Sequence, residues 1–430
     1  MTRLTEGNAM SRSTSSSSLW RPWTPVTQQA DLQITEARGC RVRGADGTWY
    51  LDGISGVLNV SCGHGHPRLI EAAVDQMQRL VHYDPMAASH QPAETLARRI
   101  AEIMPGDLNE SLLINSGSEG IEAALKICWQ YWRHLGENRE RIISLEAGYH
   151  GTTALGQELS RLPFTLNDWP NRFPVDHVAL PMEPRALRTA EGAEALLGLF
   201  SQALKSGTPA AAVIVEPLLG LGGCTVFPEG FLAGLRRLCD EYGTLLILDE
   251  IFTGFGRTGR MFGFDHDGIT PDIVVTSKGI SSGLVPLAAV TATTAIKETF
   301  RNAPVVQGLR YGHTTGGHAV AAAVAKAVLD VMDEEKLVEN AAAQGAGIRS
   351  GLDAFRAHPK ITDIRGLGLV IAIEADSPES AEAIATGAMD NGLLVRAERG
   401  VVRIAPPLTI TTDESIELVD KLSRAIATLG

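Results

Sequence analysis

The segment Thr244-Leu-Leu-Ile-Leu-Asp-Glu250 contains four consecutive apolar residues and ends in two carboxylates. An apolar run without in–out alternation is typical of a strand that is buried on both faces of a mostly parallel sheet. A carboxylate at the end of such a strand is costly to ionise unless it meets a positive group. A protonated ring nitrogen of a bound molecule, an arginine or a magnesium ion meets this need equally well. The segment therefore predicts an α/β fold with a polar site where the strand ends.

Five similar apolar runs alternate with helical stretches between residues 90 and 330. They cover residues 111–115, 141–144, 211–215, 272–276 and 288–292. Parallel strands place their carboxyl ends at one crevice, so polar residues that follow these runs are the natural candidates for a site.

Two further strand ends carry reactive or polar groups. Lys278 directly follows the run 272–276, where partial desolvation lowers the pKa of an amine and favours its nucleophilicity, although a solvated surface lysine is the commoner case. The run 111–115 leads into Asn115-Ser-Gly-Ser-Glu-Gly120 at the start of a predicted helix. Free N–H groups at a helix N-terminus bind phosphate, and simple helix capping by Ser116 or Ser118 is the alternative. Taken together, the three strand ends supply the parts that hold pyridoxal 5′-phosphate. The residues after 111–115 can bind its phosphate, Asp249 can pair with its pyridinium nitrogen, and Lys278 can form a Schiff base with its aldehyde.

The composition sets the limits of the protein class. The 430 residues are 44% hydrophobic and 20% charged, which excludes wholesale disorder and predicts two to three structural units. The net charge of −12 argues against binding to nucleic acid or an anionic membrane. No stretch has the roughly 18 continuous apolar residues that span a bilayer, so we expect a soluble, cytoplasmic protein. The five cysteines include no C-x-x-C pair, and we expect them to be reduced and structural.

The pattern along the chain predicts four segments. Residues 1–19 form a Ser-rich flexible tail, 20–75 an N-terminal part of a small domain, 76–335 a large domain, and 336–430 the C-terminal part of the small domain. Within the small domain we expect a hairpin over 42–51, a helix over 67–81 and strands near 368–374 and 393–395.

Across nearly its whole length after the tail, the sequence resembles the class III, fold type I, pyridoxal-phosphate-dependent aminotransferases, including the ω-aminotransferases. The resemblance rests on these motifs: Ser116-Gly-Ser118, Gly148-Tyr-His-Gly151, Val215-Glu-Pro217, Leu248-Asp-Glu-Ile-Phe-Thr-Gly-Phe-Gly-Arg-Thr-Gly259, Ser277-Lys-Gly279, His313-Thr-Thr-Gly-Gly-His318 and Arg403-Ile-Ala-Pro-Pro-Leu408. It implies a large domain with a mostly parallel seven-stranded sheet and a smaller α+β domain built from both ends of the chain. It also implies a homodimer with shared active sites, which can pair into a tetramer.

The resemblance further implies roles for individual residues. Lys278 forms the internal aldimine and moves the proton, and Asp249 keeps the pyridine nitrogen protonated. The other expected cofactor contacts are Ser116, Gly117, Ser118, Tyr149, His150, Glu216, Ile251 and, from the neighbouring subunit, Thr314. The expected substrate contacts are Trp23, Leu58, Tyr149, Arg396 and Arg403, with the loop at Asn59 nearby.

Departures from the family pattern guide the choice of substrate. Ornithine and 4-aminobutyrate aminotransferases carry a glutamate that neutralises the arginine matched by Arg403, and Leu221 stands at that position here. We therefore expect an uncompensated Arg403 and an enzyme that passes nitrogen from an amine or ω-amino acid to a keto acid such as pyruvate, by a ping-pong mechanism. The alternative is the diaminopelargonic acid aminotransferase of biotin synthesis, which Trp20-Arg-Pro-Trp-Thr24 favours and Thr152, in place of an acidic residue, opposes. A racemase, aminomutase or decarboxylase on the same scaffold is a further alternative.

Two other sequence patterns are typical of other kinds of site, a dinucleotide-binding loop and a metal site. Gly254-Phe-Gly-Arg-Thr-Gly259 matches the dinucleotide fingerprint G-x-G-x-x-G, but Asp249 and Glu250 intervene after the strand and no helix follows directly. His64 and His66 lack a nearby third ligand, so we expect no metal. A non-catalytic binding protein would have to keep Asp249 and Lys278 by chance.

Overall fold

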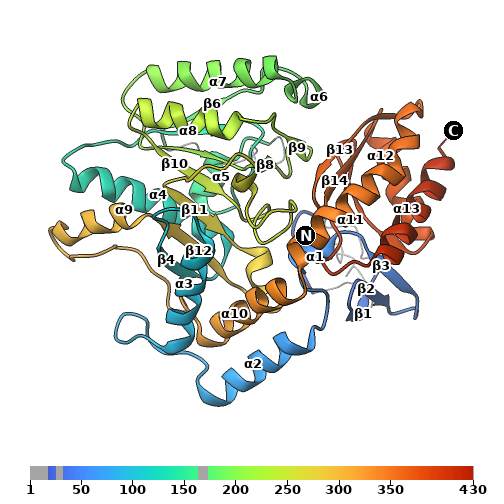
Figure 1. The fold of residues 1–430 in the computed structure, drawn as a ribbon, viewed down its shortest axis with the longest axis horizontal. Coiled ribbons are helices and arrows are strands. Elements are labelled where there is room, and N and C mark those ends of the chain that lie inside the picture. Colours follow the sequence, from blue (N-terminus) through green and yellow to red (C-terminus); the bar gives the residue numbers. More distant parts are fainter. Residues whose placement is uncertain (1–17, 26–31, 163–172, 430) are drawn as a thin grey trace, which may run out of the picture.

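A seven-stranded sheet forms the centre of the larger of two lobes in the computed structural model, which describes residues 18–25, 32–162 and 173–429 (Figure 1). Residues 1–17 of the predicted tail lie outside the described residues. The strand order is β4-β12-β11-β10-β7-β5-β6, and β12 runs in the direction opposite to the other six strands. The strands are β4 (Glu110–Ile114), β5 (Ile142–Leu145), β6 (Val175–Val178), β7 (Ala212–Val215), β10 (Leu245–Asp249), β11 (Ile273–Thr276) and β12 (Ala288–Ala292).

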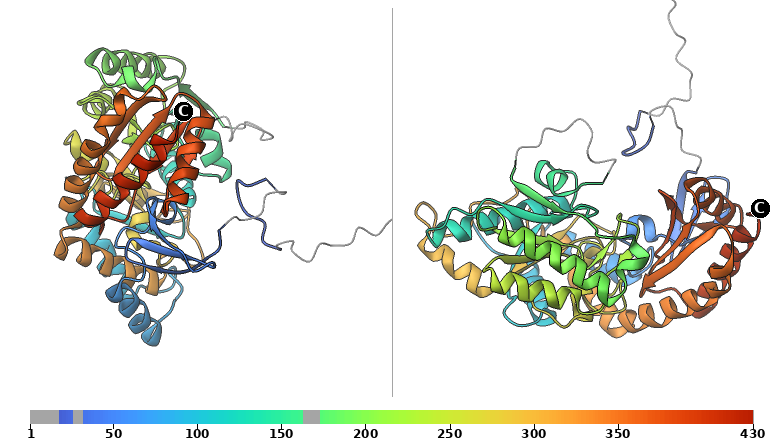
Figure 2. Two further views of the ribbon diagram at one scale, coloured as in Figure 1. Left: turned by 90° about the vertical axis from the view of Figure 1, so that its right-hand side faces the viewer. Right: turned by 90° about the horizontal axis from the view of Figure 1, so that it is seen from above.

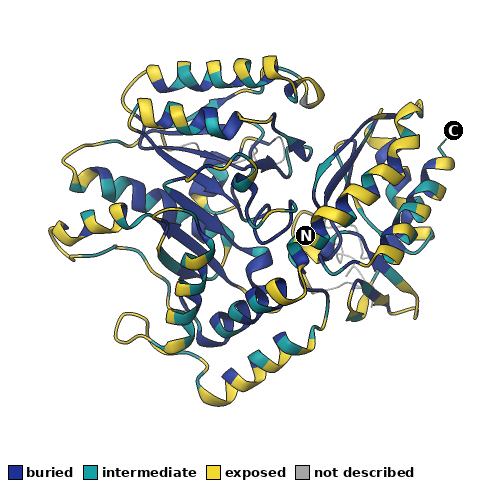
Figure 3. Cartoon of the chain, in the orientation of Figure 1, coloured by how far each residue is buried: buried dark blue, intermediate teal, exposed yellow. Residues whose placement is uncertain are grey.

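The apolar runs become strands because helices cover both faces of the sheet. Leu246 and Leu248 pack in one core cluster with α3 (Gln91–Ile103), α7 (Ala190–Lys205), α8 (Phe231–Glu241) and α10 (Ala319–Glu334). Leu245 and Ile247 pack on the other face with α4 (Gly117–His134), α5 (Ala154–Leu159) and α9 (Thr294–Thr299). Figure 3 shows the sheet as buried and the outer helix surfaces as exposed. The predicted mostly parallel sheet of seven strands is confirmed.

The edge strand β6 was not among the six runs found in the sequence. Its residues Val175-Asp-His-Val178 are half-buried except for Val178. An edge strand needs less apolar surface than a central one, so polar residues interrupt its pattern.

The smaller lobe joins the two ends of the chain (Figure 1, Figure 2). Its first sheet has the order β1-β2-β3-β15, in which β15 (Leu393–Leu394) pairs in parallel with β3 (Trp49–Asp52), next to β2 (Arg41–Gly44) and β1 (Ile34–Arg38). The predicted hairpin over 42–51 corresponds to β2 and β3. Its second sheet is antiparallel, with the order β13-β14-β17-β16. These strands are β13 (Ile361–Leu367), β14 (Val370–Ala375), β16 (Arg396–Glu398) and β17 (Val401–Ile404).

The strand expected near 368–374 was wrong in its start, because Gly368 has a φ of +54° and turns the chain between β13 and β14. Three helices accompany these strands: α11 (Leu337–Leu352), α12 (Pro378–Asp390) and α13 (Thr412–Ala427). Lys336 separates α10 from α11 in a left-handed conformation with a φ of +55°.

Five further α-helices and strands are short or lie outside the three sheets described above. They are α1 (Ser55–Leu58), α2 (Pro67–Arg79), α6 (Pro184–Leu187), β8 (Leu218–Leu219) and β9 (Thr225–Val226). Within the described residues, no helix combines the length and the apolar character that crossing a membrane requires. In the same part of the chain, no three His, Cys, Asp or Glu side chains gather as metal ligands do. All five cysteines are buried and unpaired.

Candidate active site

A cavity of about 680 Å³ lies where β10 and β11 end and the β16–β17 hairpin begins. It brings together residues that are far apart in the sequence, from the carboxyl ends of the sheet and from both segments of the smaller lobe. The predicted site residues on its wall are Trp23, Leu58, Ser116, Gly117, Ser118, Tyr149, Glu216, Asp249, Ile251, Lys278, Arg396 and Arg403.

Lys278 follows β11 and is half-buried in this cavity. Its Nζ lies 5.4 Å from the centroid of the Phe252 ring. Burial lowers the pKa of Lys278 to about 8, and the carboxylates of Asp249 and Glu216 offset part of this effect. The amine therefore carries a much larger neutral, nucleophilic fraction near pH 7 than a solvated lysine.

Asp249 is the last residue of β10, and a buried histidine side chain contacts its carboxylate. Its Oδ2 lies 2.8 Å from Nδ1 of the fully buried His150, and its Oδ1 accepts a hydrogen bond of 3.1 Å from the Ile251 N–H. The backbone N–H of His150 in turn donates to Ser160 Oγ at 2.7 Å. His150 does not line the cavity itself, and its ring contacts the Asp249 carboxylate behind the cavity wall.

The first turn of α4 forms one end of the cavity. Ser116 caps this helix by accepting a hydrogen bond of 3.3 Å from the Glu119 N–H, as the capping alternative predicted. Gly117 and Ser118 begin the helix, where N–H groups have no partner within the helix. A Cβ at Gly117 would lie 2.8 Å from Cδ1 of Ile251, and one at Gly151 would lie 2.4 Å from Ser118 Oγ. Glycine at these positions allows the close approach that shapes the cradle.

Glu216 links two segments of the cavity wall. Its two carboxylate oxygens accept hydrogen bonds from the backbone N–H groups of Tyr149, at 3.0 Å, and Gly220, at 2.9 Å. Burial raises the pKa of Glu216 to about 7, and that of the Tyr149 hydroxyl also rises through burial and the nearby carboxylates. Glu216 therefore positions the backbone on both sides of it.

Arg403 is not uncompensated, and the expectation from Leu221 was wrong on this point. Nη2 of Arg403 on β17 donates to Oε2 of Glu398 on β16 at 2.6 Å. Leu221 contributes its backbone instead, since its carbonyl accepts a hydrogen bond from the Arg399 side chain. Ornithine and 4-aminobutyrate aminotransferases carry this carboxylate after the Glu-Pro pair, whereas here the β16–β17 hairpin supplies Glu398 from the strand adjacent to Arg403.

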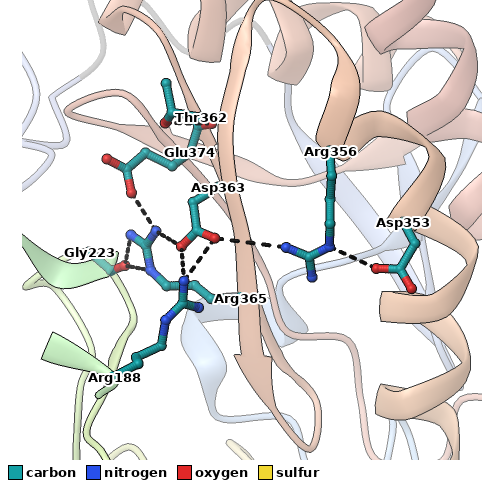
Figure 4. A network of polar contacts seen from close by, with 8 residues as sticks. All are labelled: Arg188, Gly223, Asp353, Arg356, Thr362, Asp363, Arg365 and Glu374. Atoms are coloured by element: carbon teal, nitrogen blue, oxygen red, sulfur yellow. Dashed lines mark hydrogen bonds and ion pairs between the residues drawn. The ribbon is translucent and has the colours of Figure 1, made fainter. Parts of the chain in front are cut away.

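A network of charges, missed in the sequence, fixes the loop beside the cavity to the smaller lobe (Figure 4). Arg365 on β13 is almost fully buried and donates from Nε to the Gly223 carbonyl at 2.9 Å, from Nη1 to Asp363 at 3.0 Å, and to Glu374. Arg188 donates to both oxygens of Asp363 at 2.9 Å. The sequence does contain a sign of this network, the opposite charges of Asp363 and Arg365. Residues two apart on a strand share a face, so these two charges can offset the cost of each other's burial.

Other predicted features lie away from this cavity. Thr314 is exposed and lines a different depression, together with His82 and Asp84. Asn59 does not line the cavity either, and its side chain accepts a hydrogen bond from the Val57 N–H at 3.1 Å. The His64 and His66 rings contact carboxylates, Asp52 at 2.8 Å and Glu335 at 3.0 Å.

The glycine-rich segment 254–259 forms turns and not a phosphate-binding loop. Gly256 and Gly259 both have a φ of +82°, and the segment does not line the cavity. Arg257 within it is buried and donates to the Pro406 carbonyl at 2.6 Å and to Ser55 Oγ at 3.1 Å. The segment therefore ties the larger lobe to both ends of the chain.

The donor set of the cavity fits pyridoxal 5′-phosphate. The first turn of α4 offers N–H groups to a phosphate, the buried Asp249 offers a negative charge to a protonated ring nitrogen, and Lys278 offers an amine to an aldehyde.

Comparison with known proteins agrees with this geometry. The family model "Aminotransferase class-III" matches residues 24–426. The structure of an (S)-enantioselective ω-transaminase from Thermomicrobium roseum has a TM-score of 0.90 and 33% identity, covering 95% of each chain. An ω-transaminase from Pseudomonas jessenii, solved in complex with PMP, has a TM-score of 0.89 and 32% identity, covering 95% of this chain and 96% of that one. The adenosylmethionine-8-amino-7-oxononanoate aminotransferase of Geobacter sulfurreducens is 31% identical over 96% of each chain.

These matches extend over nearly the whole chain and include both lobes that form the cavity. The chain therefore belongs to the class III aminotransferases and is a pyridoxal-phosphate-dependent enzyme of the fold type I architecture.

Proposed function

We propose that the enzyme takes an amino group from an amine or an ω-amino acid and passes it to a keto acid such as pyruvate, in two half-reactions at one site. The observation that carries this proposal is the composition of a single cavity. Lys278 and Asp249, where β10 and β11 end, form what we call its cofactor end, and Arg403, a buried arginine on β17 suited to a carboxylate, belongs to what we call its substrate end. Leu58, Leu221 and Phe252 contribute apolar wall. Such a cavity can accept both an apolar amine and a small keto acid.

We assign the chemical steps to Lys278 and Asp249 at the cofactor end of the cavity. Lys278 Nζ holds the cofactor and moves the proton at the substrate carbon that bears nitrogen. Asp249, supported by His150, would hold the ring nitrogen in its protonated form. When bound, pyridoxal 5′-phosphate supplies an electron sink for the charge left on that carbon.

The remaining cofactor residues position and shield the ring and the phosphate. Ser116, Gly117 and Ser118 would hold the phosphate, and Tyr149 and Ile251 would pack against the ring. Glu216 orients the Tyr149 backbone, which limits the motion of that ring face.

We assign the substrate end to residues of the smaller lobe and the N-terminal segment. Arg403 binds the carboxylate of the keto acid, because a planar guanidinium matches a carboxylate with two parallel donors. Arg396, Trp23 and Leu58 lie along the same wall and contact the rest of the substrate.

We also infer a homodimer with shared sites, with Thr314 donating to the phosphate of the neighbouring subunit. Thr314 is exposed and lies outside the cavity of its own chain, which fits such a role. We propose that residues 76–335 form the large domain and that residues 20–75 and 336–430 together form the small domain. A cytoplasmic location fits five buried, unpaired cysteines.

The first experiment is the visible absorption spectrum of the holoenzyme, recorded with a panel of amines and amino acids in the absence of any keto acid. We expect certain donors to bleach the band of the pyridoxal form, and pyruvate to restore it. Parallel lines in double-reciprocal plots at varied amine and keto acid then establish the ping-pong order. A holoenzyme whose band responds to no donor contradicts the proposal.

The second candidate is the diaminopelargonic acid aminotransferase, which carries the name adenosylmethionine-8-amino-7-oxononanoate aminotransferase in the Geobacter sulfurreducens relative, because Trp23 of the Trp20-Arg-Pro-Trp-Thr24 segment lines the cavity. Thr152, in contrast, is exposed and does not line it. Bleaching by S-adenosylmethionine, but not by simple amines, would favour this candidate.

A further inference from the structure

The strands β8 and β9 form a hairpin that follows β7 of the larger lobe, and we call its residues 220–224 the hairpin tip. Gly220 and Leu221 of the tip line the cavity. The Gly223 carbonyl accepts two hydrogen bonds from Arg365 on β13 of the smaller lobe, from Nε at 2.9 Å and from Nη2 at 2.5 Å. Arg365 is buried and is not among the described residues that line the cavity. The smaller lobe therefore holds part of the cavity wall through a residue that lies outside the site.

Two contacts connect the hairpin tip to the segment that carries Tyr149. Glu216 accepts a hydrogen bond from the Gly220 N–H with one carboxylate oxygen and from the Tyr149 N–H with the other. Gly222 lies directly against Ala147, because a Cβ at Gly222 would be 2.6 Å from the Ala147 carbonyl oxygen. A shift of the tip therefore reaches Tyr149 along two routes.

Hydrogen bonds within the hairpin stiffen its tip. The Cys224 N–H donates to the Gly220 carbonyl at 3.1 Å, and Oγ1 of Thr225 donates to the Gly222 carbonyl at 2.8 Å. Gly223 has a φ of +82°, a conformation that other residues rarely adopt. The position that Arg365 gives to Gly223 is thus passed on to Gly220 and Gly222.

The charge of Arg365 is balanced within its own sheet. Its Nη1 donates to Asp363 at 3.0 Å and also to Glu374 on β14 (Figure 4). Two carboxylates meet the charge of this buried guanidinium, so the contact with the neutral Gly223 carbonyl is not needed to offset the burial of the charge. The two bonds to Gly223 use the other donors of the guanidinium, and they fix the hairpin tip to the smaller lobe.

A second contact between the lobes lies beside the first one. Arg188, which follows α6, donates to both oxygens of Asp363 at 2.9 Å. Its side chain is 28% exposed, whereas that of Arg365 is 1% exposed. The two arginines share Asp363, but of these two only Arg365 donates to the hairpin tip in the described part of the chain. They separate general anchoring of the lobes from contact with the tip.

We propose that Arg365 is a positioning residue that acts on the cofactor ring through the hairpin tip and Tyr149. Arg365 fixes Gly223, and the tip in turn fixes the backbone from which the Tyr149 side chain would pack against the ring. A displacement of the smaller lobe is passed in this way to the cofactor end of the cavity. This inference rests on the proposed packing of Tyr149 and names the residue of the smaller lobe that controls it.

The test compares the wild-type holoenzyme with Arg365→Met and with Arg188→Met as a matched control. Methionine removes the donors and keeps an unbranched, apolar side chain. Arg188→Met breaks a contact with the same aspartate and leaves the hairpin tip untouched. The first readout is amide hydrogen exchange in the peptides that contain Tyr149 and Gly220, measured by mass spectrometry. The second is the dissociation constant of pyridoxal 5′-phosphate. Neither readout depends on turnover.

We expect Arg365→Met to speed exchange in both peptides by about tenfold, because loss of the contact with Gly223 frees the tip. The dissociation constant of the cofactor should rise by about tenfold, and kcat should fall by a similar factor with KM changed by at most about threefold. Arg188→Met should change no readout by more than about twofold. Equal effects of the two variants would show general anchoring of the lobes and overturn the proposal, as would a folded Arg365→Met enzyme with unchanged exchange at Tyr149.

A double-mutant cycle tests the route through Glu216. Glu216→Gln keeps the size of the side chain but leaves one acceptor oxygen in place of two. If Arg365 acts through this carboxylate, the combined loss of cofactor affinity should be smaller than the product of the two single losses by at least about threefold. Single losses that simply multiply in the double variant contradict this route.

Two further results keep the test decisive. If Arg365→Met does not fold, Arg365→Lys replaces it, since lysine keeps the charge beside Asp363 and Glu374 but lacks the planar fork that gives two bonds to one carbonyl. Exchange and cofactor affinity should then shift in the same direction by a smaller amount, and unchanged values overturn the proposal. If the wild type transaminates no donor, the proposed function fails, while both of these readouts still decide the role of Arg365.

Discussion

The two ends of the cavity differ in how firmly their charged groups are held. At the cofactor end, Asp249 is fixed by His150 and by a backbone N–H, and both oxygens of Glu216 accept backbone hydrogen bonds. At the substrate end, Arg403 has one carboxylate partner, and Trp23 is 60% exposed. Groups fixed by several hydrogen bonds suit chemistry that is the same for every substrate, while groups with fewer fixed contacts suit a site that accepts two substrates in turn.

The largest expected effect tests the cofactor end. Lys278→Ala should lower the turnover of any donor by at least about a thousandfold, because the amine that holds the cofactor and moves the proton is removed. Steady-state kinetics measure the loss. Lys360→Ala, which removes a surface lysine that pairs with Asp376, serves as the control. Turnover of the Lys278 variant within tenfold of wild type would contradict the assignment.

Asp249→Asn should lower kcat by about 100-fold or more, since a neutral amide no longer stabilises a protonated ring nitrogen. His150→Ala should have a smaller effect, because Asp249 remains and loses only its support. Absorption spectra of the bound cofactor and kcat for both variants give the comparison. A larger loss for His150 than for Asp249 would reverse the roles proposed for them.

A substitution at the substrate end should separate the two half-reactions. Arg403→Leu should raise KM for pyruvate by about 10- to 100-fold, because the partner of its carboxylate is lost. The half-reaction with sec-butylamine should change far less, by about threefold at most. Rapid-mixing measurements of each half-reaction provide both numbers. Equal losses in the two would show that Arg403 supports the cavity in general and not the carboxylate.

A change of pH, without any substitution, should also alter the reactivity of Lys278. Since burial lowers the pKa of this amine to about 8, it is mainly protonated below that pH and mainly neutral above it. The rate at which apo-protein captures pyridoxal 5′-phosphate should therefore rise about tenfold per pH unit between 6 and 7 and level off above about 8. Stopped-flow absorbance measures this rate. A rise that continues to pH 10 would indicate a solvated lysine.

Much of the cofactor end was predictable because local patterns define it. A strand buried on both faces needs a continuous apolar run, so β10 and β11 were recognisable, and the polar residues that follow them had to meet at one edge of the sheet. Ser116, Gly117 and Ser118 were found in the same way, from a strand followed by a helix start. The edge strand β6 was missed because its half-buried residues need not be apolar.

The substrate end was less predictable, because its contacts depend on how distant segments pack. The sequence indicated Arg403 as a substrate contact and showed Leu221 where some relatives carry a glutamate. From these two observations we expected an unpaired arginine, and this expectation was wrong. Glu398 is only five residues from Arg403, yet the pair exists because β16 and β17 form a tight hairpin that was not anticipated.

The amino-acid sequence alone determined the α/β fold, the family and the residues at the ends of buried strands, since apolar runs and the groups that follow them are local properties. Tertiary structure alone decided which charges meet. Arg365 reaches the Gly223 carbonyl across 142 residues, and Arg399 reaches that of Leu221 across 178. Hydrogen bonds and ion pairs act over a few ångströms, so their partners are set only when the two lobes have packed around the cavity.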